Sequence, residues 1–336
     1  MRVAVIGAGG WGTALSIAAA RAGREVRLWS RNASVVEDIN VRRVNATYLE
    51  GQTVPDGVAA TTEAHAALNG AELVVLAAPS HATRAVLEGM RGLFEPAAVF
   101  VSATKGVEVE TGRRISEVVG EVLGDEAAER FACLSGPSFA QEVAAGQPTA
   151  VVASSRDESL ARLVQQALSA QSFRVYTNPD VVGTELGGAS KNVMALAAGM
   201  VAGLGLGMNT VSALITRGLA EMTRLALAEG GRLETLMGLA GLGDLVLTCT
   251  GGLSRNRFVG QELGRGRTLA DVLAGMREVA EGVRTTRAIR LLAARRGVEM
   301  PITEEVHAVL YDGKPARAAV ESLMTRPLKN EVDSNQ

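Results

Sequence analysis

Lysine is rare in this chain, and one lysine stands where acid–base chemistry is feasible. Four of the 34 basic residues are lysines and 30 are arginines. An ammonium group can lose its proton at a buried site, whereas a guanidinium in practice cannot. Lys191 lies in the segment GGASKNVMALAAGM, with no carboxylate three or four residues away to pair with it on a helix. Burial would lower its pKa toward the range of proton transfer, so Lys191 is the candidate proton donor and acceptor; a solvated lysine is the alternative.

Polar residues directly follow two of the predicted strands, at the edge where open α/β sheets bind ligands. Lys105 lies in the segment 102–106 (SATKG), just after an apolar run. Gly136 and Ser138 lie in the segment SGPSF, in the same kind of position before a helix. We expect Ser138 to cap that helix and to offer its hydroxyl to a polar ligand. Ordinary strand-to-helix turns are the alternative for both segments.

Two later segments add charged and amide side chains. Asp244 ends the segment GLGD, and Ser254, Arg255 and Asn256 follow it shortly. Arg255 offers a fork of donors that suits a phosphate or a carboxylate. Asp244 can accept a hydrogen bond from a substrate hydroxyl or orient a lysine. Taken singly, each of these residues is equally well explained as a surface residue in water.

A glycine-rich turn near the N-terminus indicates a dinucleotide site. The sequence GAGGWG follows an apolar, β-branched run (RVAVI) and opens a helical segment, and a second strand follows over 25–29. A G-x-G-x-x-G is weak evidence alone but strong in this context. Gly7 permits the tight turn, Gly9 lets the backbone approach a pyrophosphate, and Gly12 lets the helix pack against the strand. The N–H groups of the helix N-terminus then hold the anion.

The residues after the second strand select the cofactor. An Asp or Glu there would bind the ribose 2′-hydroxyl of NAD. This chain has Trp29, Ser30, Arg31 and Asn32 instead. A guanidinium beside a hydroxyl and an amide suits a 2′-phosphate, so we predict NADP in preference to NAD. The alternative is that Arg31 only stacks on adenine or is solvated.

Cysteine and histidine are too few to support most metal or thiol chemistry. The chain has two cysteines and three histidines, with no C-x-x-C or H-E-x-x-H spacing, so we predict no metal site. No histidine flanks Cys249 or Cys133, which favours buried structural thiols over a nucleophile. Free thiols indicate a reducing compartment. His81 is expected at a helix start near the cofactor, with an acid–base role as the alternative.

Alternating strands and helices place these residues on an α/β domain followed by an all-α domain. Apolar strand runs alternate with helical segments up to the turn at 178–180, which predicts parallel βαβ units in a doubly wound Rossmann sheet. Beyond it the sequence shows helical stretches and glycine-rich turns without strand alternation. We predict a dinucleotide-binding domain over 1–185 and a helical substrate and catalytic domain over 186–336.

Charge and hydropathy exclude several classes of protein. The net charge is −2, without the basic excess of a nucleic-acid binder. The N-terminal apolar run reads better as strand, turn and helix than as a signal peptide. The apolar run 193–208 would span about 24 Å as a helix, short of the ~30 Å hydrocarbon core. We therefore expect a cytoplasmic protein without a membrane span or a nucleic-acid partner.

The ordered segments together resemble bacterial NAD(P)-dependent glycerol-3-phosphate dehydrogenase along almost the whole chain. They are GAGGWGTAL, PSH, SATKG, SGPSFAQE, GGASKN, LITRGLAEM, GLAGLGDLVLTCT, SRN, VAEGVRTT and GVEMPITEEV. The resemblance implies a helical domain like that of 6-phosphogluconate dehydrogenase. It also implies reversible reduction of dihydroxyacetone phosphate to sn-glycerol 3-phosphate, a precursor of phospholipids.

The same resemblance implies roles for individual residues. Lys191 matches the catalytic proton donor and acceptor. The residues matching substrate contacts are Lys105, Gly136, Ser138, Lys191, Asp244, Ser254, Arg255 and Asn256. The residues matching cofactor contacts are Gly10, Trp11, Arg31, Lys105, Ala140, Arg255, Val279 and Glu281. Two other functions stay open on the residues alone: a β-hydroxyacid-type dehydrogenase acting on a carboxylate, and a non-catalytic NADP sensor. A homodimer also stays open.

Overall fold

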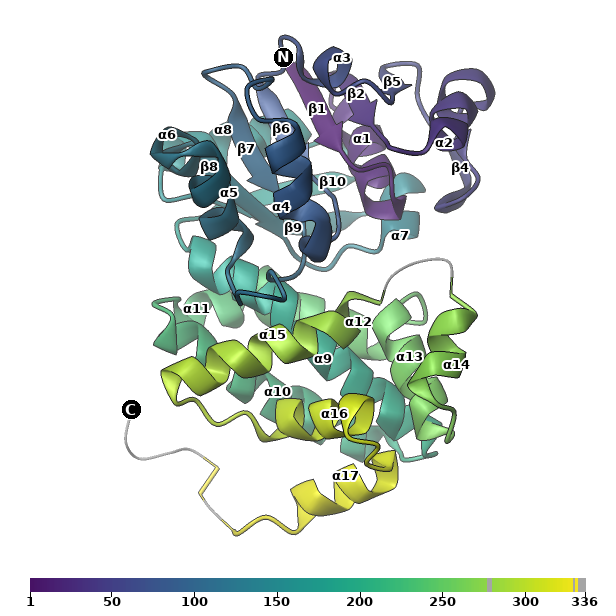
Figure 1. The fold of residues 1–336 in the computed structure, drawn as a ribbon, viewed down its shortest axis with the longest axis vertical. Helices are drawn as coiled ribbons and strands as arrows, with labels where there is room; N and C mark the ends of the chain where they lie inside the picture. The colour runs from purple at the N-terminus through teal and green to yellow at the C-terminus, as the bar shows by residue number, and fades with distance from the viewer. Residues whose placement is uncertain (277–279, 329, 332–336) are drawn as a thin grey trace.

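The computed structural model describes residues 1–276, 280–328 and 330–331. It has an α/β half, which carries the N-terminus, and an all-helical half below it in Figure 1. This confirms the predicted fold class.

The α/β half is built on one eight-stranded sheet. Its strands, in spatial order, are β10 (Phe173–Asn178), β9 (Thr149–Ser154), β8 (Phe131–Ser135), β7 (Val99–Ser102), β6 (Leu73–Leu76), β1 (Arg2–Ile6), β2 (Glu25–Trp29) and β5 (Val58–Thr61). All neighbouring strands are parallel except β8 and β9, which are antiparallel. The chain leaves β1 toward β2 and β5, then returns to β6 on the other side of β1. The carboxyl ends of β1 and β6 therefore flank a switch point, where doubly wound sheets bind ligands.

Helices cover both faces of the sheet because its central strands are apolar and buried on both sides. One apolar cluster joins the sheet to α1 (Gly10–Arg21) and α8 (Glu158–Leu168), with α7 (Ala140–Ala144) beside them. The other joins the opposite face to α3 (Ala64–Leu68), α4 (Ser80–Gly89), α5 (Ile115–Leu123) and α6 (Asp125–Glu129).

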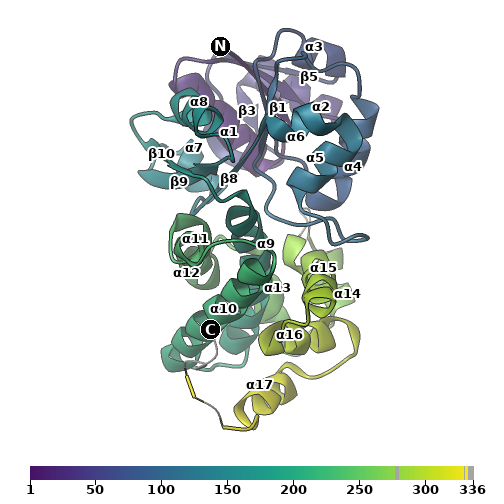
Figure 2. The same cartoon turned by 90° about the vertical axis from the view of Figure 1, so that its left-hand side faces the viewer.

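The helical half is organised around α9 (Val181–Gly203), of which nearly every residue is buried. Its alanines and glycines allow close helix packing: a Cβ at Gly199 would overlap the backbone of a neighbouring helix at Arg257. The other helices are α10 (Met208–Ala228), α11 (Leu233–Leu236), the π-helix η2 (Leu239–Gly243), α12 (Asp244–Thr250), α13 (Arg255–Gly264), α14 (Leu269–Ala274), α15 (Glu281–Arg296), α16 (Pro301–Tyr311) and α17 (Ala316–Met324). Figure 2 shows them below the sheet.

Helix α9 also joins the two halves. The side chain of Asp180 accepts a hydrogen bond from the backbone N–H of Gly183 and so caps the helix. Val181, its first residue, packs in an apolar cluster of the α/β half. The helix runs without a break across the predicted division between residues 185 and 186, which stays a prediction.

Several elements were not predicted from the sequence. They are α2 (Ala33–Glu37), the π-helix η1 (Asp38–Arg42), a hairpin of β3 (Val44–Asn45) and β4 (Leu49–Thr53), and the edge strand β5. The antiparallel direction of β9 was also missed, because an apolar strand has the same composition in either direction.

Within the described residues, one stretch has the length and hydropathy of a membrane span. It is Leu233–Thr250, with 18 residues and a mean hydropathy of 1.3. It comprises α11, η2 and α12 with a break at residues 237–238, rather than one continuous α-helix.

Candidate active site

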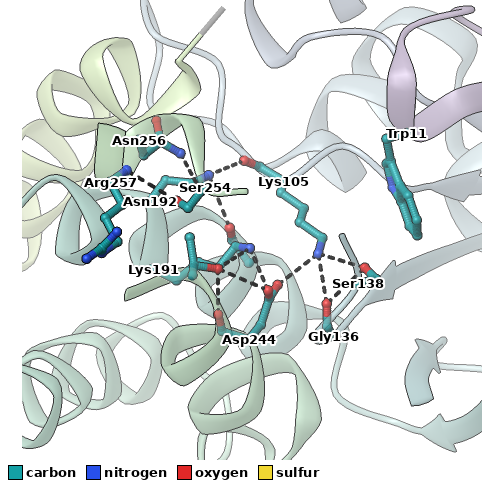
Figure 3. Close-up of polar contacts among 12 residues, drawn as sticks. Trp11, Lys105, Gly136, Ser138, Lys191, Asn192, Asp244, Ser254, Asn256 and Arg257 are labelled. Atoms are coloured by element: carbon teal, nitrogen blue, oxygen red, sulfur yellow. Dashed lines mark hydrogen bonds and ion pairs between the residues drawn. The ribbon is translucent and has the colours of Figure 1, made fainter. Parts of the chain in front are cut away.

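Two lysines share one buried aspartate at the junction of the two halves. Asp244 is 1% exposed; its Oδ1 lies 2.6 Å from Nζ of Lys191 and its Oδ2 lies 2.9 Å from Nζ of Lys105. Lys191 is also buried. The three side chains come from α9, from α12 and from the loop after β7, and they meet in Figure 3. Asp244 contacts both lysines, as the second of the two roles considered for it, orienting a lysine, requires.

Burial and the neighbouring charges shift the pKa of Lys191 and that of Asp244. The pKa of Lys191 is lowered to about 8: burial lowers it most, the Asp244 carboxylate raises it, and the Lys105 ammonium lowers it. For Asp244, burial alone would raise the pKa, but the two ammonium groups more than offset it and hold the pKa below its usual value. At neutral pH the cluster therefore has one anion and two cations, and Lys191 is close to its proton-exchange range.

Thr248 completes the surroundings of Lys191, and the sequence analysis missed it. Its hydroxyl oxygen accepts a hydrogen bond from Nζ of Lys191 at 2.9 Å and donates to the backbone carbonyl of Asp244 at 2.6 Å. Residues four apart on a helix share one face, so the spacing from Asp244 was a usable signal.

The loop after β8 approaches Lys105 from the other side. Nζ of Lys105 donates to the carbonyl of Gly136 at 2.8 Å and to the hydroxyl of Ser138 at 3.1 Å. The expected helix cap by Ser138 is wrong: α7 begins at Ala140, its N-cap is Phe139, and no side chain caps it. Gly136 has φ +133°, and the loop turns so that Ser138 faces Lys105 instead.

A chain of amides links the segments around the lysines. Nδ2 of Asn192 donates to the backbone carbonyl of Lys105, and Nδ2 of Asn256 donates to Oδ1 of Asn192, both at 2.9 Å. Oδ1 of Asn256 accepts from the backbone N–H of Gly282 at 2.9 Å. Asn192 was not predicted, although it is adjacent to Lys191.

The segment of Ser254, Arg255 and Asn256 starts α13. The Ser254 hydroxyl caps that helix by accepting from the backbone N–H of Arg257 at 3.2 Å. Arg255 is its first residue and is exposed, whereas Asn256 is buried. Helix N-termini favour anions.

The glycine turn after β1 fits a dinucleotide. Gly7 has φ +115°, which disfavours any side chain, and a Cβ at Gly12 would overlap the carbonyl oxygen of Gly7. A Cβ at Gly9 would meet nothing within 4 Å, so the backbone there borders open space. Gly10 begins α1, and a Cβ on it would lie 3.8 Å from that of Ala140. This strand–turn–helix geometry can hold a pyrophosphate.

Two more predicted cofactor residues, Trp11 and Glu281, border the loop after β7 that carries Lys105. Nε1 of Trp11 donates to the carbonyl of Ala103 at 3.1 Å, and the Lys105 ammonium lies 5.6 Å from the Trp11 ring (Figure 3). Oε1 of Glu281 accepts from the backbone N–H of Ser80 at 3.1 Å, and burial raises the Glu281 pKa. Val279 lies outside the described residues.

The remaining candidates lie around this centre. Arg31 is exposed in the loop after β2. His81 is the second residue of α4, as expected, and burial, with Arg284 and Arg31, lowers its pKa. Cys249 is buried, and burial raises its pKa to about 12, which agrees with a structural thiol. Among the described residues, no three His, Cys, Asp or Glu side chains gather as a metal site would require.

Two family models together match almost the whole chain. The model described as NAD-dependent glycerol-3-phosphate dehydrogenase N-terminus matches residues 2–161, and the C-terminus model matches residues 180–321. The chain belongs to the NAD-dependent glycerol-3-phosphate dehydrogenase family.

Individual members of this glycerol-3-phosphate dehydrogenase family are similar over their full length. A protein of Koribacter versatilis named glycerol-3-phosphate dehydrogenase (NAD(P)+) is 56% identical over 333 residues, 98% of this chain and 99% of that protein. One of the same name from Geobacter sulfurreducens is 54% identical, with 98% of each chain covered. A crystal structure of glycerol-3-phosphate dehydrogenase from Coxiella burnetii has a TM-score of 0.92 and 40% identity, and covers 97% of this chain and 99% of that one.

Proposed function

We propose that this chain catalyses the reversible NAD(P)H-dependent reduction of dihydroxyacetone phosphate to sn-glycerol 3-phosphate, which supplies glycerophospholipid synthesis. The observation that carries the proposal is the pair of lysines on Asp244 at the ligand-binding edge of a dinucleotide fold. The names of its full-length relatives support it.

Lys191 is the proposed catalytic residue. NADPH or NADH, when bound, would supply the hydride that reduces the C2 carbonyl of the substrate. The Lys191 ammonium donates the proton and stabilises the negative charge that develops on the carbonyl oxygen. In the oxidation of glycerol 3-phosphate the neutral amine takes the hydroxyl proton. Asp244 and Thr248 hold Nζ in place for both directions.

The other residues are proposed to bind and orient the substrate. Lys105 lies beside Asp244, where a second cation can polarise the ketone or bind the C1 hydroxyl oxygen. Gly136 and Ser138 position Lys105 by accepting hydrogen bonds from its ammonium group, and they line the substrate site beside it. The start of α13, with Ser254, Arg255 and Asn256, is the proposed phosphate anchor.

The cofactor is proposed to lie along the glycine turn. Gly7, Gly9 and Gly12 shape the pyrophosphate cradle, with Gly10 and Trp11 at the start of α1. The proposed contacts beyond the turn are Arg31, Lys105, Ala140, Arg255, Val279 and Glu281. We further propose a cytoplasmic protein, without a nucleic-acid partner; a homodimer stays open.

The assay that tests the proposal is the loss of NADPH or NADH absorbance with dihydroxyacetone phosphate. Saturable turnover supports the assignment. A carboxylate substrate panel covers the second candidate, a β-hydroxyacid-type dehydrogenase, since Arg255 suits either anion. Protein that binds NADPH but turns over no substrate of either class would point to a sensor and refute the proposal.

We expect a pH profile with a midpoint near the Lys191 pKa of about 8. Reduction requires the ammonium form, so its kcat/KM falls as pH rises through about 8. Oxidation requires the amine form, so its kcat/KM rises over the same interval. Initial rates in both directions across this range measure the midpoint. If the residual activity of a Lys191→Met variant has the same pH midpoint as the unmodified chain, the titrating group is not Lys191.

Replacing Arg31 with serine is expected to weaken NADPH binding about 10-fold or more, because the variant loses a charge-assisted contact of about 1.5–3 kcal/mol to the 2′-phosphate. NADH lacks that phosphate, so its affinity changes little. Fluorescence titration with each cofactor gives the ratio of dissociation constants. Arg27→Ser is the matched control, because Arg27 lies on β2 and pairs with Glu25. An equal loss for both cofactors would mean that Arg31 contacts the adenosine rather than the 2′-phosphate.

A further inference from the structure

The loop between β7 and α5 is held by both halves of the molecule. Its residue Val107 is completely buried and belongs to the apolar core of the helical half, although the loop starts and ends in the α/β half. Nη1 of Arg295 on α15 donates to the carbonyl of Thr111 at 2.7 Å. Asn192 on α9 holds the carbonyl of Lys105. The loop that carries Lys105 is therefore fixed at several points across the junction.

Glu108 anchors the same loop to the α/β half. Its side chain is 8% exposed, and Arg84 on α4 binds it with two arms, Nε to Oε1 at 2.7 Å and Nη2 to Oε2 at 3.0 Å. The Thr111 hydroxyl donates to the same carboxylate. Arg84 lowers the pKa of Glu108, so the carboxylate stays charged at neutral pH. Nη2 of Arg84 also binds Glu121 on α5 at 2.7 Å.

A partly buried ion pair such as this one contributes little net stability, because desolvation offsets most of its attraction. A two-armed guanidinium–carboxylate pair does fix one orientation. Here it fixes the backbone three residues after Lys105, whose ammonium must reach Asp244, Gly136 and Ser138 at once. Glu108 has none of these groups among its partners, so its influence on the site is indirect.

We propose that Arg84 and Glu108 are positioning residues, which hold the β7–α5 loop so that the Lys105 ammonium stays beside Asp244 and the substrate. The inference rests on the proposed function, in which Lys105 binds substrate. Loss of the pair lets the loop shift and moves Nζ of Lys105 away from its three partners. Misplacement by about 1 Å can reduce turnover about 10²-fold.

The test is Glu108→Gln, which keeps the size of the side chain and removes its charge. We expect kcat/KM for dihydroxyacetone phosphate to fall about 10- to 100-fold, while NADPH affinity by titration stays unchanged. The midpoint of the pH profile should also rise above about 8, because the charge of Lys105 lowers the Lys191 pKa and would now act from farther away. The other titratable groups that act on Lys191, Asp244 and Cys249, are unaltered.

Companion variants separate positioning from stability. Arg84→Lys keeps the charge but loses the two-armed contact, so it should show a smaller shift in the same direction. Thr111→Val is a milder change, because it removes only the hydrogen bond from the Thr111 hydroxyl to the Glu108 carboxylate. Arg162→Met is the matched control, because Arg162 pairs with Glu158 on α8 and both side chains are exposed. Its pH midpoint should match that of the unmodified chain.

Lys105→Met provides the reference for complete loss of the positioned ammonium, and Glu108→Gln should reproduce its midpoint shift. A Glu108→Gln protein with a lower melting temperature but an unchanged midpoint and kcat/KM would overturn the inference. If Lys105→Met is also fully active, Lys105 does not bind the substrate as proposed, and the inference that depends on it is wrong. No turnover by the unmodified chain would instead refute the proposed function itself.

Discussion

Replacing Lys191 with methionine is expected to lower kcat about 10²- to 10⁴-fold, the usual contribution of a positioned acid–base group. Methionine matches the apolar stem of lysine and fits a site that is almost closed to solvent. Asp244 keeps Lys105 as a partner in this variant, so no carboxylate is left buried without a cation. NADPH binding should persist, because the glycine turn lies in the other half of the molecule.

The measurement combines single-turnover kinetics with NADPH titration. Lys314→Met is the matched control: this lysine pairs with Glu305 on α16, away from the cluster, and should support normal turnover. A Lys191→Met protein with turnover within a few-fold of the unmodified chain would remove Lys191 from the catalytic role. Loss of NADPH binding would instead indicate a wider change in the fold.

The sequence predicted the parts of the site that local chemistry marks. The glycine turn needs a positive φ at Gly7 and no Cβ at Gly12, and only glycine satisfies both. Lys191 was singled out by the lack of a helical partner, and the structure supplies that partner 53 residues later in Asp244. Local patterns could not choose between the two roles of Asp244, because the choice depends on the packing of α12 against α9.

Other features depend on contacts that no local pattern carries. Ser138 stands before α7 like a capping residue, but the left-handed backbone at Gly136 turns it toward Lys105. Glu108 carries no local signal in the sequence, because its burial depends on the packing of its loop, in which the adjacent Val107 lies in the core of the helical half. The direction of β9 is equally hidden, since β8 and β9 pair through backbone groups that every residue has.

Replacing Asp244 with asparagine is expected to shift the pH midpoint in the direction opposite to the Lys105 and Glu108 variants. The carboxylate raises the Lys191 pKa against burial, so its loss should move the midpoint below about 8. Reduction near neutral pH then suffers because less of Lys191 carries the proton it must donate. Nζ of both lysines also loses its shared anchor, and kcat/KM should fall about 10²-fold or more. A midpoint that stays in place or rises would show that Lys191 is not the titrating group.

The same substitution should have a stability effect that depends on pH. A lysine whose folded pKa lies below its unfolded value of about 10.4 binds fewer protons when folded, so stability rises with pH between the two values. The Asp244→Asn protein should therefore lose about 3–5 kcal/mol at about pH 6, where buried ammonium groups lack their counter-ion, and less at about pH 9. Denaturant unfolding at both pH values measures this difference. Asp56→Asn, which alters a fully exposed carboxylate, is the control and should show neither effect. An equal loss at both pH values would mean that Asp244 supports the fold through its hydrogen bonds rather than through its charge.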